Sequence, residues 1–172
     1  NEWFFKEGHP VIEISYDWND STKTQTVTVE QKQDFEKNPL YRIPLRADVY
    51  HDGIVEHKKI VVERAKEIFE WKYEAKPDLI NMDAERMLLA EKKDNKSKEN
   101  YVFQFYHAPL YLDRFEALNK TGSDYEENAP AGKMMEDGLR DKYWNIRVQA
   151  LKNIGTQVKA NKERLKPVIL MM

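Results

Sequence analysis

The first ninety or so residues alternate between apolar and polar side chains, whereas the later residues have apolar groups at helical spacing. Alternation with a period of two places one face of a strand on a core and the other in water. We therefore expect short strands, beginning near residue 11. The alternating sets are Ile12, Ile14, Tyr16 and Trp18; Val27, Val29, Gln31 and Gln33; and Ile43, Leu45, Ala47 and Val49.

A tight hairpin is expected where the third alternating run meets Asp52-Gly53. This dipeptide favours a type I′ turn, because both central residues of such a turn need a positive φ. Counting back from the turn, Asp48 lies opposite His57. The sequence thus predicts both a strand pair and the contact of an imidazole with a carboxylate.

Further strands are expected over 69–73 and 79–82, separated by Lys76-Pro77-Asp78. Some seven short strands, with turns about every ten residues, are typical of a β-sandwich. The expected fold class is therefore α+β: an immunoglobulin-like antiparallel β-sandwich, followed by an α-helical segment of the HEAT/ARM-like type.

The helical part begins near residue 100, where apolar residues switch to one-turn spacing. A second helix is expected over 110–118, and a loop rich in Gly, Ser, Asp and Pro over 121–130. The next helix runs over 141–155, with Asp141 as a plausible N-cap and Gly155 as the stop. The last stretch to Met172 is expected to be another helix, kinked at Pro167.

One face of the predicted 141–155 helix carries Trp144, Val148 and Leu151, with Ile154 one turn further on. Two helices, a turn and an apolar end are typical of the first unit of a helical solenoid, although one unit does not establish a repeat. The predicted domains are a sandwich over 1–91, connecting helices and a loop over 92–130, and the start of a HEAT-like domain over 131–172.

The charge and the composition of the chain limit the classes of binding partner and the kinds of site that we expect. Lys and Arg number 28 against 30 Asp and Glu, giving a net charge of −2. This balance gives no electrostatic reason to expect nucleic acid or an anionic membrane as a partner. Cysteine is absent, which excludes disulfides, thiolate nucleophiles and cysteine-based zinc sites from these 172 residues.

The four histidines, His9, His51, His57 and His107, do not form the His-Glu-x-x-His zinc arrangement. The pair His57–Asp48 has two interpretations. A carboxylate that orients an imidazole is an element of catalytic sites. It is also a common surface pair of small energetic effect, and the residues alone favour that interpretation.

Three other groups of residues are candidates for a binding site. Asp83, Glu85, Asp94 and Glu99 lack the spacing of a calcium loop. The lysine-rich run 92–98 favours a solvated loop over a phosphate site. The aromatic strand 69–73 favours sandwich core over a sugar or peptide platform. We therefore expect no catalytic, cofactor-binding or metal-binding residue in this chain.

Several short motifs nevertheless occur in a definite order along nearly the whole chain. They are Trp3-Phe4-Phe5 with Gly8-His9-Pro10; Val29-Glu30-Gln31-Lys32-Gln33; Arg42-Ile43-Pro44-Leu45; Pro77 to Ala84; Leu112 to Ala117; and Tyr143-Trp144 with Arg147 and Ala150-Leu151. Together they resemble the part that follows the catalytic domain in zinc aminopeptidases of the aminopeptidase N (gluzincin) family, most closely the bacterial members.

That resemblance implies a supporting role. In the family, a preceding domain holds zinc and cleaves the first peptide bond of a peptide, and no residue of that site has a counterpart here. The sandwich would brace this catalytic domain, and the helices would begin the wall of the active-site cavity. The implied partners are the catalytic domain and further C-terminal helices, with a peptide as the parent enzyme's substrate.

The apolar ends of the chain agree with this expectation. Trp3-Phe4-Phe5 and Val168 to Met172 would be unusual at the exposed termini of a free-standing domain, so we expect a piece of a longer protein. Two alternatives stay open: a scaffold part of a catalytically inactive relative, or an independent β-sandwich that binds a glycan or peptide. An exposed Trp71 would favour the binding module, and a buried one would argue against it.

Overall fold

The computed structural model describes residues 8–122, 129–155 and 166, in a chain that divides into two compact units. The first unit is Asn1–Lys96 and the second is Ser97–Met172. The sequence had placed the end of the sandwich at residue 91. The first unit extends five residues further because it includes an additional strand, β7 (Glu91–Asp94).

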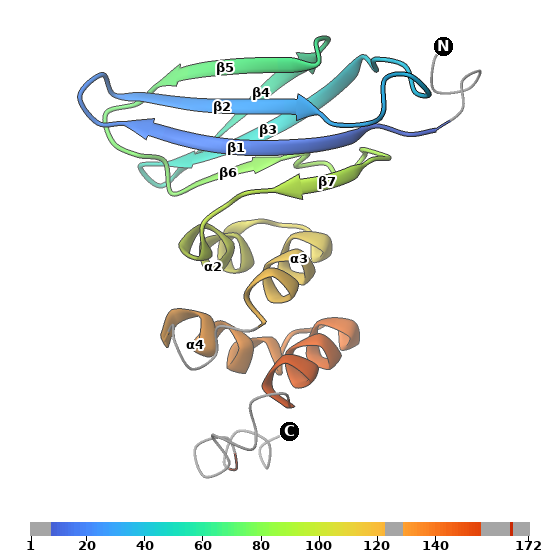
Figure 1. Ribbon diagram of the computed structural model, residues 1–172. Helices are drawn as coiled ribbons and strands as arrows, with labels where there is room; N and C mark the ends of the chain where they lie inside the picture. Colours follow the sequence, from blue (N-terminus) through green and yellow to red (C-terminus); the bar gives the residue numbers. More distant parts are fainter. Residues whose placement is uncertain (1–7, 123–128, 156–165, 167–172) are drawn as a thin grey trace. The chain divides into compact units, whose positions relative to one another are not determined.

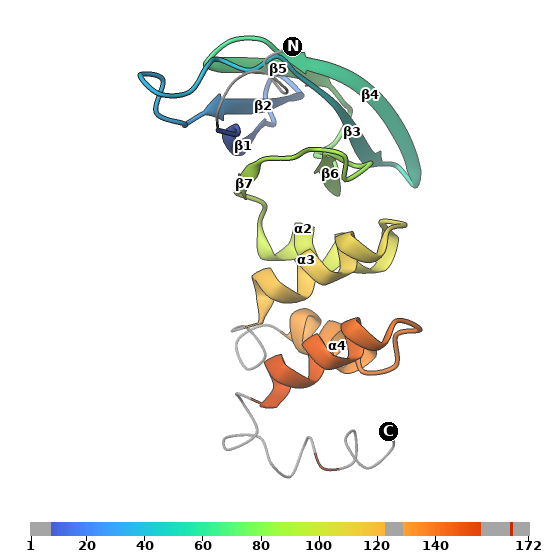
Figure 2. The same cartoon turned by 90° about the vertical axis from the view of Figure 1, so that its right-hand side faces the viewer.

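The first unit is a β-sandwich of two sheets, with strand orders β5-β2-β1-β7 and β4-β3-β6 (Figure 1). Figure 2 shows the curved β3–β4 hairpin in one layer and β1 with β2 in the other. The predicted fold class, a β-sandwich followed by helices, is confirmed. The strands besides β7 are β1 (Val11–Asn19), β2 (Thr24–Gln31), β3 (Ile43–His51), β4 (Ile54–Val62), β5 (Lys66–Lys72) and β6 (Leu79–Met82).

The β3–β4 hairpin has the predicted turn and register. Asp52 and Gly53 have φ values of 49° and 74°, as a type I′ turn requires. Asp48 is aligned with His57, as counted back from the turn. A local turn signal therefore sufficed to place two residues nine positions apart on one sheet face.

The alternating residues form the sandwich core, but the two glutamines on the predicted second strand have a different role. Gln31 is buried, and its side-chain amide donates to the carbonyl oxygen of Tyr41 at 2.7 Å. Its amide oxygen accepts from the backbone N–H of Tyr41 at 3.0 Å. Gln33 then donates to the Gln31 oxygen at 2.9 Å. The side chains thus satisfy backbone groups where the ladder ends.

Strand β7 is the departure from the expected antiparallel sandwich, because it pairs with β1 in parallel. Its sequence, Glu91 to Asp94, has no apolar alternation, so periodicity gave no sign of a strand. The pairing also revises the expectation of a solvated loop over 92–98. Asp94 and Lys96 are buried, since β7 carries the first of them into the unit beside Tyr16.

The second unit contains short helices around one core. The helices are α2 (Lys98–His107), α3 (Tyr111–Thr121), α4 (Ala129–Gly138) and a further helix over 144–155. Ser97 caps α2, where its hydroxyl accepts from the Asn100 backbone N–H and the Asn100 side chain reaches back to the Ser97 N–H. Helices on both sides of the predicted 121–130 loop share this core, so that loop does not separate two units.

Of the predicted apolar set on the helix over 144–155, Trp144, Val148 and Leu151 are exposed on one side, whereas Ile154 belongs to the buried side. Ile146, Ala150 and Ile154 are fully buried, whereas Trp144 is 66% exposed. Apolar residues line both sides of this helix, so the sequence alone could not say which side faces the core. Asp141 does cap its start, accepting from the Tyr143 N–H at 2.8 Å. The predicted kink at Pro167 lies outside the described residues.

Candidate functional site

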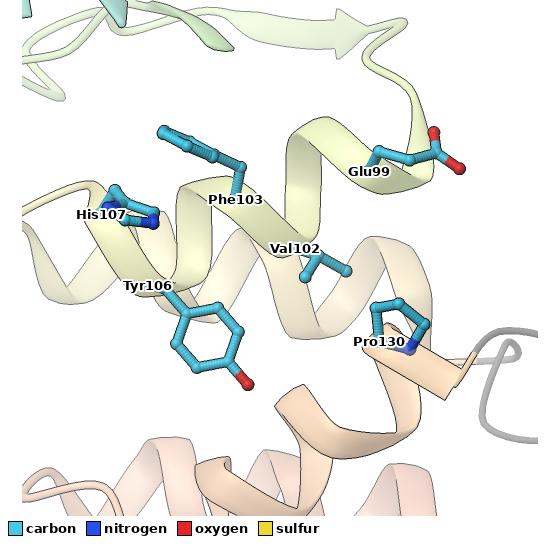
Figure 3. Close-up of a pocket in the computed structure, with 6 residues that line it drawn as sticks. All are labelled: Glu99, Val102, Phe103, Tyr106, His107 and Pro130. Carbon is cyan, nitrogen blue, oxygen red and sulfur yellow. The ribbon is translucent and has the colours of Figure 1, made fainter. Parts of the chain in front are cut away.

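A pocket of about 380 Å³ lies between α2 and the start of α4, and Figure 3 shows its lining. Val102 and Tyr106 point from α2 toward Pro130, while the rings of Phe103 and His107 stack at 4.0 Å on another side of that helix. The Tyr106 hydroxyl donates to Asp137 at 2.8 Å. A pocket of this size and lining can hold a small apolar group.

Tyr106 is an ionisable group of this pocket, and its pKa is shifted. Burial, and then the hydrogen bond to Asp137, raise the pKa of Tyr106 above its usual value. The shift favours the protonated hydroxyl, which donates to Asp137. The sequence did not single out this pocket, because its walls come from residues on two helices that only the fold brings together.

The predicted pair His57–Asp48 is present on the outer face of the β3–β4 hairpin. His57 Nδ1 lies 2.7 Å from Asp48 Oδ1. The Asp48 side chain is only 3% exposed and His57 is 58% exposed. The expectation of an ordinary surface pair is thus wrong for the carboxylate, which is buried between its neighbours on the sheet.

Arg46 is a third member of the group formed by His57 and Asp48, and the sequence did not predict its part. Its Nη2 donates to Asp48 Oδ2 at 3.2 Å, and its Nη1 donates to Glu85 Oε1 at 3.0 Å. Arg46 precedes Asp48 by two residues, so strand periodicity already placed both on one face. Because the Arg46 guanidinium pairs with the buried Asp48 carboxylate, the charge of that carboxylate is compensated within the hairpin, while the His57 imidazole stays exposed.

The aromatic strand face is occupied by the protein's own cation. Phe69 and Trp71 are partly buried against the sandwich core, as the favoured interpretation expected. The Lys58 ammonium lies 5.3 Å from the Trp71 ring centre and 5.7 Å from that of Tyr73. It also donates to Glu56 at 2.7 Å. Such a cation over the rings leaves little of the face for a sugar.

Three of the acidic residues that are candidates for a calcium site have separate partners. Asp83 accepts the backbone N–H groups of Met87 and Leu88, at 3.0 and 3.3 Å. Asp94 pairs with Lys96, and Glu85 pairs with arginine as described above. Over the described ranges 8–122, 129–155 and 166, no group of three or more His, Asp or Glu residues could hold a metal ion. These residues therefore do not fit a zinc site.

Comparisons with known proteins give a likeness of fold. No family model matches the chain, and neither does any curated protein sequence. Among solved structures, the aminopeptidase A of Legionella pneumophila, in complex with aspartic acid, matches 97% of this chain with a TM-score of 0.72. The chain therefore shares its fold with part of the Legionella protein.

The sequences of the two proteins are only 14% identical, so the likeness shows the fold and not the activity. The chain spans 23% of the length of the Legionella protein. In the part of the chain that the structure describes, no helix is long and apolar enough to cross a membrane.

Proposed function

We propose that this chain is a non-catalytic structural part of a zinc-dependent aminopeptidase that removes N-terminal amino acids from peptides. The observation that carries the proposal is the match over 97% of the chain to an aminopeptidase. The match includes the sandwich and the helical unit in one chain order, which is more specific than likeness to a sandwich alone.

In this proposal the sandwich braces a preceding catalytic domain, which would hold the zinc ion, and the helices begin a HEAT-like wall around the active-site cavity. The helix over 144–155 supports continuation of the helical array. It buries one apolar side and exposes Trp144, Val148 and Leu151 on the other. A further helix laid on that side would bury it, as in stacked helical repeats.

The structure bears differently on the two alternative functions, a glycan- or peptide-binding sandwich and a scaffold part of an inactive relative. A glycan-binding sandwich is disfavoured, because Trp71 is partly buried and lies beside Lys58. A scaffold part of a catalytically inactive aminopeptidase relative would have the same fold and the same residues. It differs from the proposal only in the activity of the parent protein.

The purified 172-residue chain provides the first test. Incubated with zinc and dialysed, it should retain less than one equivalent of metal, and it should hydrolyse no aminoacyl nitroanilide. Zinc-dependent turnover, removed by a chelator and restored by metal, would overturn the non-catalytic assignment. Activity of the native parent polypeptide then separates the enzyme from the inactive scaffold.

A further inference from the structure

Strand β4 is a long strand at the edge of its sheet, whose strand order is β4-β3-β6. It runs over nine residues, Ile54–Val62, whereas β6 at the other edge has four. Among the residues that the structure describes, no strand pairs with the outer side of β4 (Figure 2). An edge strand presents a row of unpaired backbone N–H and C=O groups, which is a template for pairing with another chain.

The backbone contacts of β3 show which groups of β4 turn outward. Opposite residues of an antiparallel pair alternate between those that exchange hydrogen bonds and those that do not. The carbonyl oxygens of Arg46 and Tyr50 accept from backbone N–H groups beside β6, so they point away from β4. Their partners on β4, Lys59 and Val55, therefore turn their own N–H and C=O groups away from β3.

The same alternation gives the full set of outward groups, which belong to Val55, His57, Lys59 and Val61. Pro44 agrees with this set, because it lacks an N–H and lies opposite Val61, where β3 donates no hydrogen bond to β4. Val55 is 43% exposed, and the His57 side chain is 58% exposed. The outer edge of β4 thus offers backbone hydrogen bonds from Val55 to Val61.

The charges on β4 select one way for this edge to pair with a second copy of itself. In an antiparallel pair about a two-fold axis, the outward residues lie opposite each other only if the axis passes through a residue. An axis at Glu56, Lys58 or Lys59 puts like charges directly opposite each other, which is destabilising. An axis at His57 instead puts Glu56 opposite Lys58 of the second copy, and does so twice. An axis near either end of the strand pairs only a few residues.

The other cross-strand pairs of the His57-centred register are compatible with it. Ile54, which is 57% exposed, lies opposite Ile60 of the second copy, so the contact covers an exposed apolar side chain. The two His57 side chains face each other, and each has the Asp48 carboxylate of its own chain at 2.7 Å to compensate a proton. Lys58 donates to Glu56 within each chain at 2.7 Å, so the contact joins two such pairs into a group of four alternating charges.

We propose that two copies of this chain associate through β4, in antiparallel and with His57 at the two-fold axis. The three-stranded sheets of the two copies then form one continuous sheet. The backbone edge supplies the hydrogen bonds, and the alternation of Glu56 and Lys58 fixes the register. This contact does not depend on the proposed function, because it uses only the sandwich.

Disulfide formation tests the register. The chain contains no cysteine, so a single engineered cysteine reports only on its own copy. In His57→Cys the two cysteines lie opposite each other, at a Cα separation of about 5.5 Å, which a disulfide can bridge. In the control Lys59→Cys, also at an exposed position, they are four residues and about 14 Å apart along the strands.

Under mild oxidation, His57→Cys should form the disulfide-linked dimer about tenfold faster than Lys59→Cys. Equal rates in the two variants, or faster dimer formation by Lys59→Cys, would overturn the proposal.

Sedimentation velocity with charge variants gives a second measurement. The unsubstituted chain should show a dimer whose fraction rises with concentration. E56K puts lysines opposite lysines and K58E puts carboxylates opposite carboxylates, so each variant alone should sediment as a monomer, with circular dichroism as the check of folding. In an equimolar mixture each lysine of one variant lies opposite a carboxylate of the other, and the dimer should return. A monomeric unsubstituted chain, or a mixture that stays monomeric, would refute the β4 contact.

Discussion

The buried ion pair between Asp94 and Lys96 should be a major determinant of the stability of the sandwich. Lys96 Nζ lies 3.0 Å from Asp94 Oδ2, and each side chain is only 1% exposed. The Tyr16 hydroxyl donates to Asp94 Oδ1 at 2.8 Å, and Lys92 Nζ lies 3.5 Å from Oδ2. Removing one member of a buried pair leaves the other charge without its compensation, at a cost of about 3–5 kcal/mol.

The two single substitutions should differ in size. In Lys96→Met the Asp94 carboxylate keeps Tyr16 and Lys92, so we expect the lower end, about 3 kcal/mol. Asp94→Asn leaves two ammonium groups that lose the carboxylate they share, so we expect about 5 kcal/mol. The double variant D94N/K96M removes both members of the pair, so it should be more stable than Asp94→Asn alone, although Lys92 still loses the carboxylate.

Equilibrium urea unfolding tests this, followed by circular dichroism and tryptophan fluorescence. Because the chain has two units, the sandwich transition is fitted separately, with Trp18 and Trp71, which pack on the sandwich core, as its probes. If both single variants lose less than about 1 kcal/mol, the pair behaves like an exposed ion pair and the reasoning is wrong. A double variant as unstable as the sum of the singles would contradict it too, since coupled residues should not be additive.

Three further predictions concern other buried groups. Burial raises the pKa of Asp83, so the folded protein binds a proton at this carboxyl more readily than the unfolded chain does. The free energy of unfolding should therefore fall as pH rises from the ordinary pKa through the raised one. Asp83→Asn should raise the melting temperature at pH 7, and an equal gain at pH 3 would contradict this. Ile146→Ala should cost about 2–4 kcal/mol in urea unfolding, whereas Trp144→Gln should cost under about 0.5 kcal/mol, and the reverse order would show that the helix packs through its Trp144 side. Arg46→Met should cost about 3 kcal/mol because it removes the cation that compensates a buried carboxylate on β3, while the exposed His57→Ala should cost under about 1 kcal/mol. A larger loss in His57→Ala than in Arg46→Met would show that the imidazole, not the guanidinium, compensates that charge.

Periodicity predicted most of the sandwich because each of its main strands buries one face. The Asp52-Gly53 turn even placed Asp48 opposite His57. Periodicity did not predict strand β7, because this strand is defined by its backbone pairing with β1. Its side chains, Glu91 to Asp94, do not alternate between apolar and polar. Backbone hydrogen bonding of this kind cannot be detected from the pattern of hydrophobic residues.

The helix over 144–155 shows a different limit of pattern reasoning. Ile146, Ala150 and Ile154 form one apolar side, and Trp144 with Val148 forms another. Either side satisfies helical periodicity, so the choice depends on which neighbouring helices are present. Trp144 is the larger residue, but size does not decide which side packs.

For the candidate site, the sequence predicted the contact of His57 with Asp48 but not its burial. Burial of Asp48 depends on strands that pair across long sequence separations. Arg46 could have been found, since it lies two residues before Asp48 on the same strand face. The pocket beside Tyr106 could not, because residues on α2 and α4 meet there only through the fold.

The most direct test of the aminopeptidase assignment uses the native protein. An antibody raised against these 172 residues should precipitate, from cells that make the protein, a polypeptide several times larger than 20.5 kDa. That polypeptide should release N-terminal amino acids from peptides, lose this activity to a chelator and regain it with zinc. A native polypeptide of 20.5 kDa, or a large one that binds no zinc and releases no amino acid, would contradict the assignment.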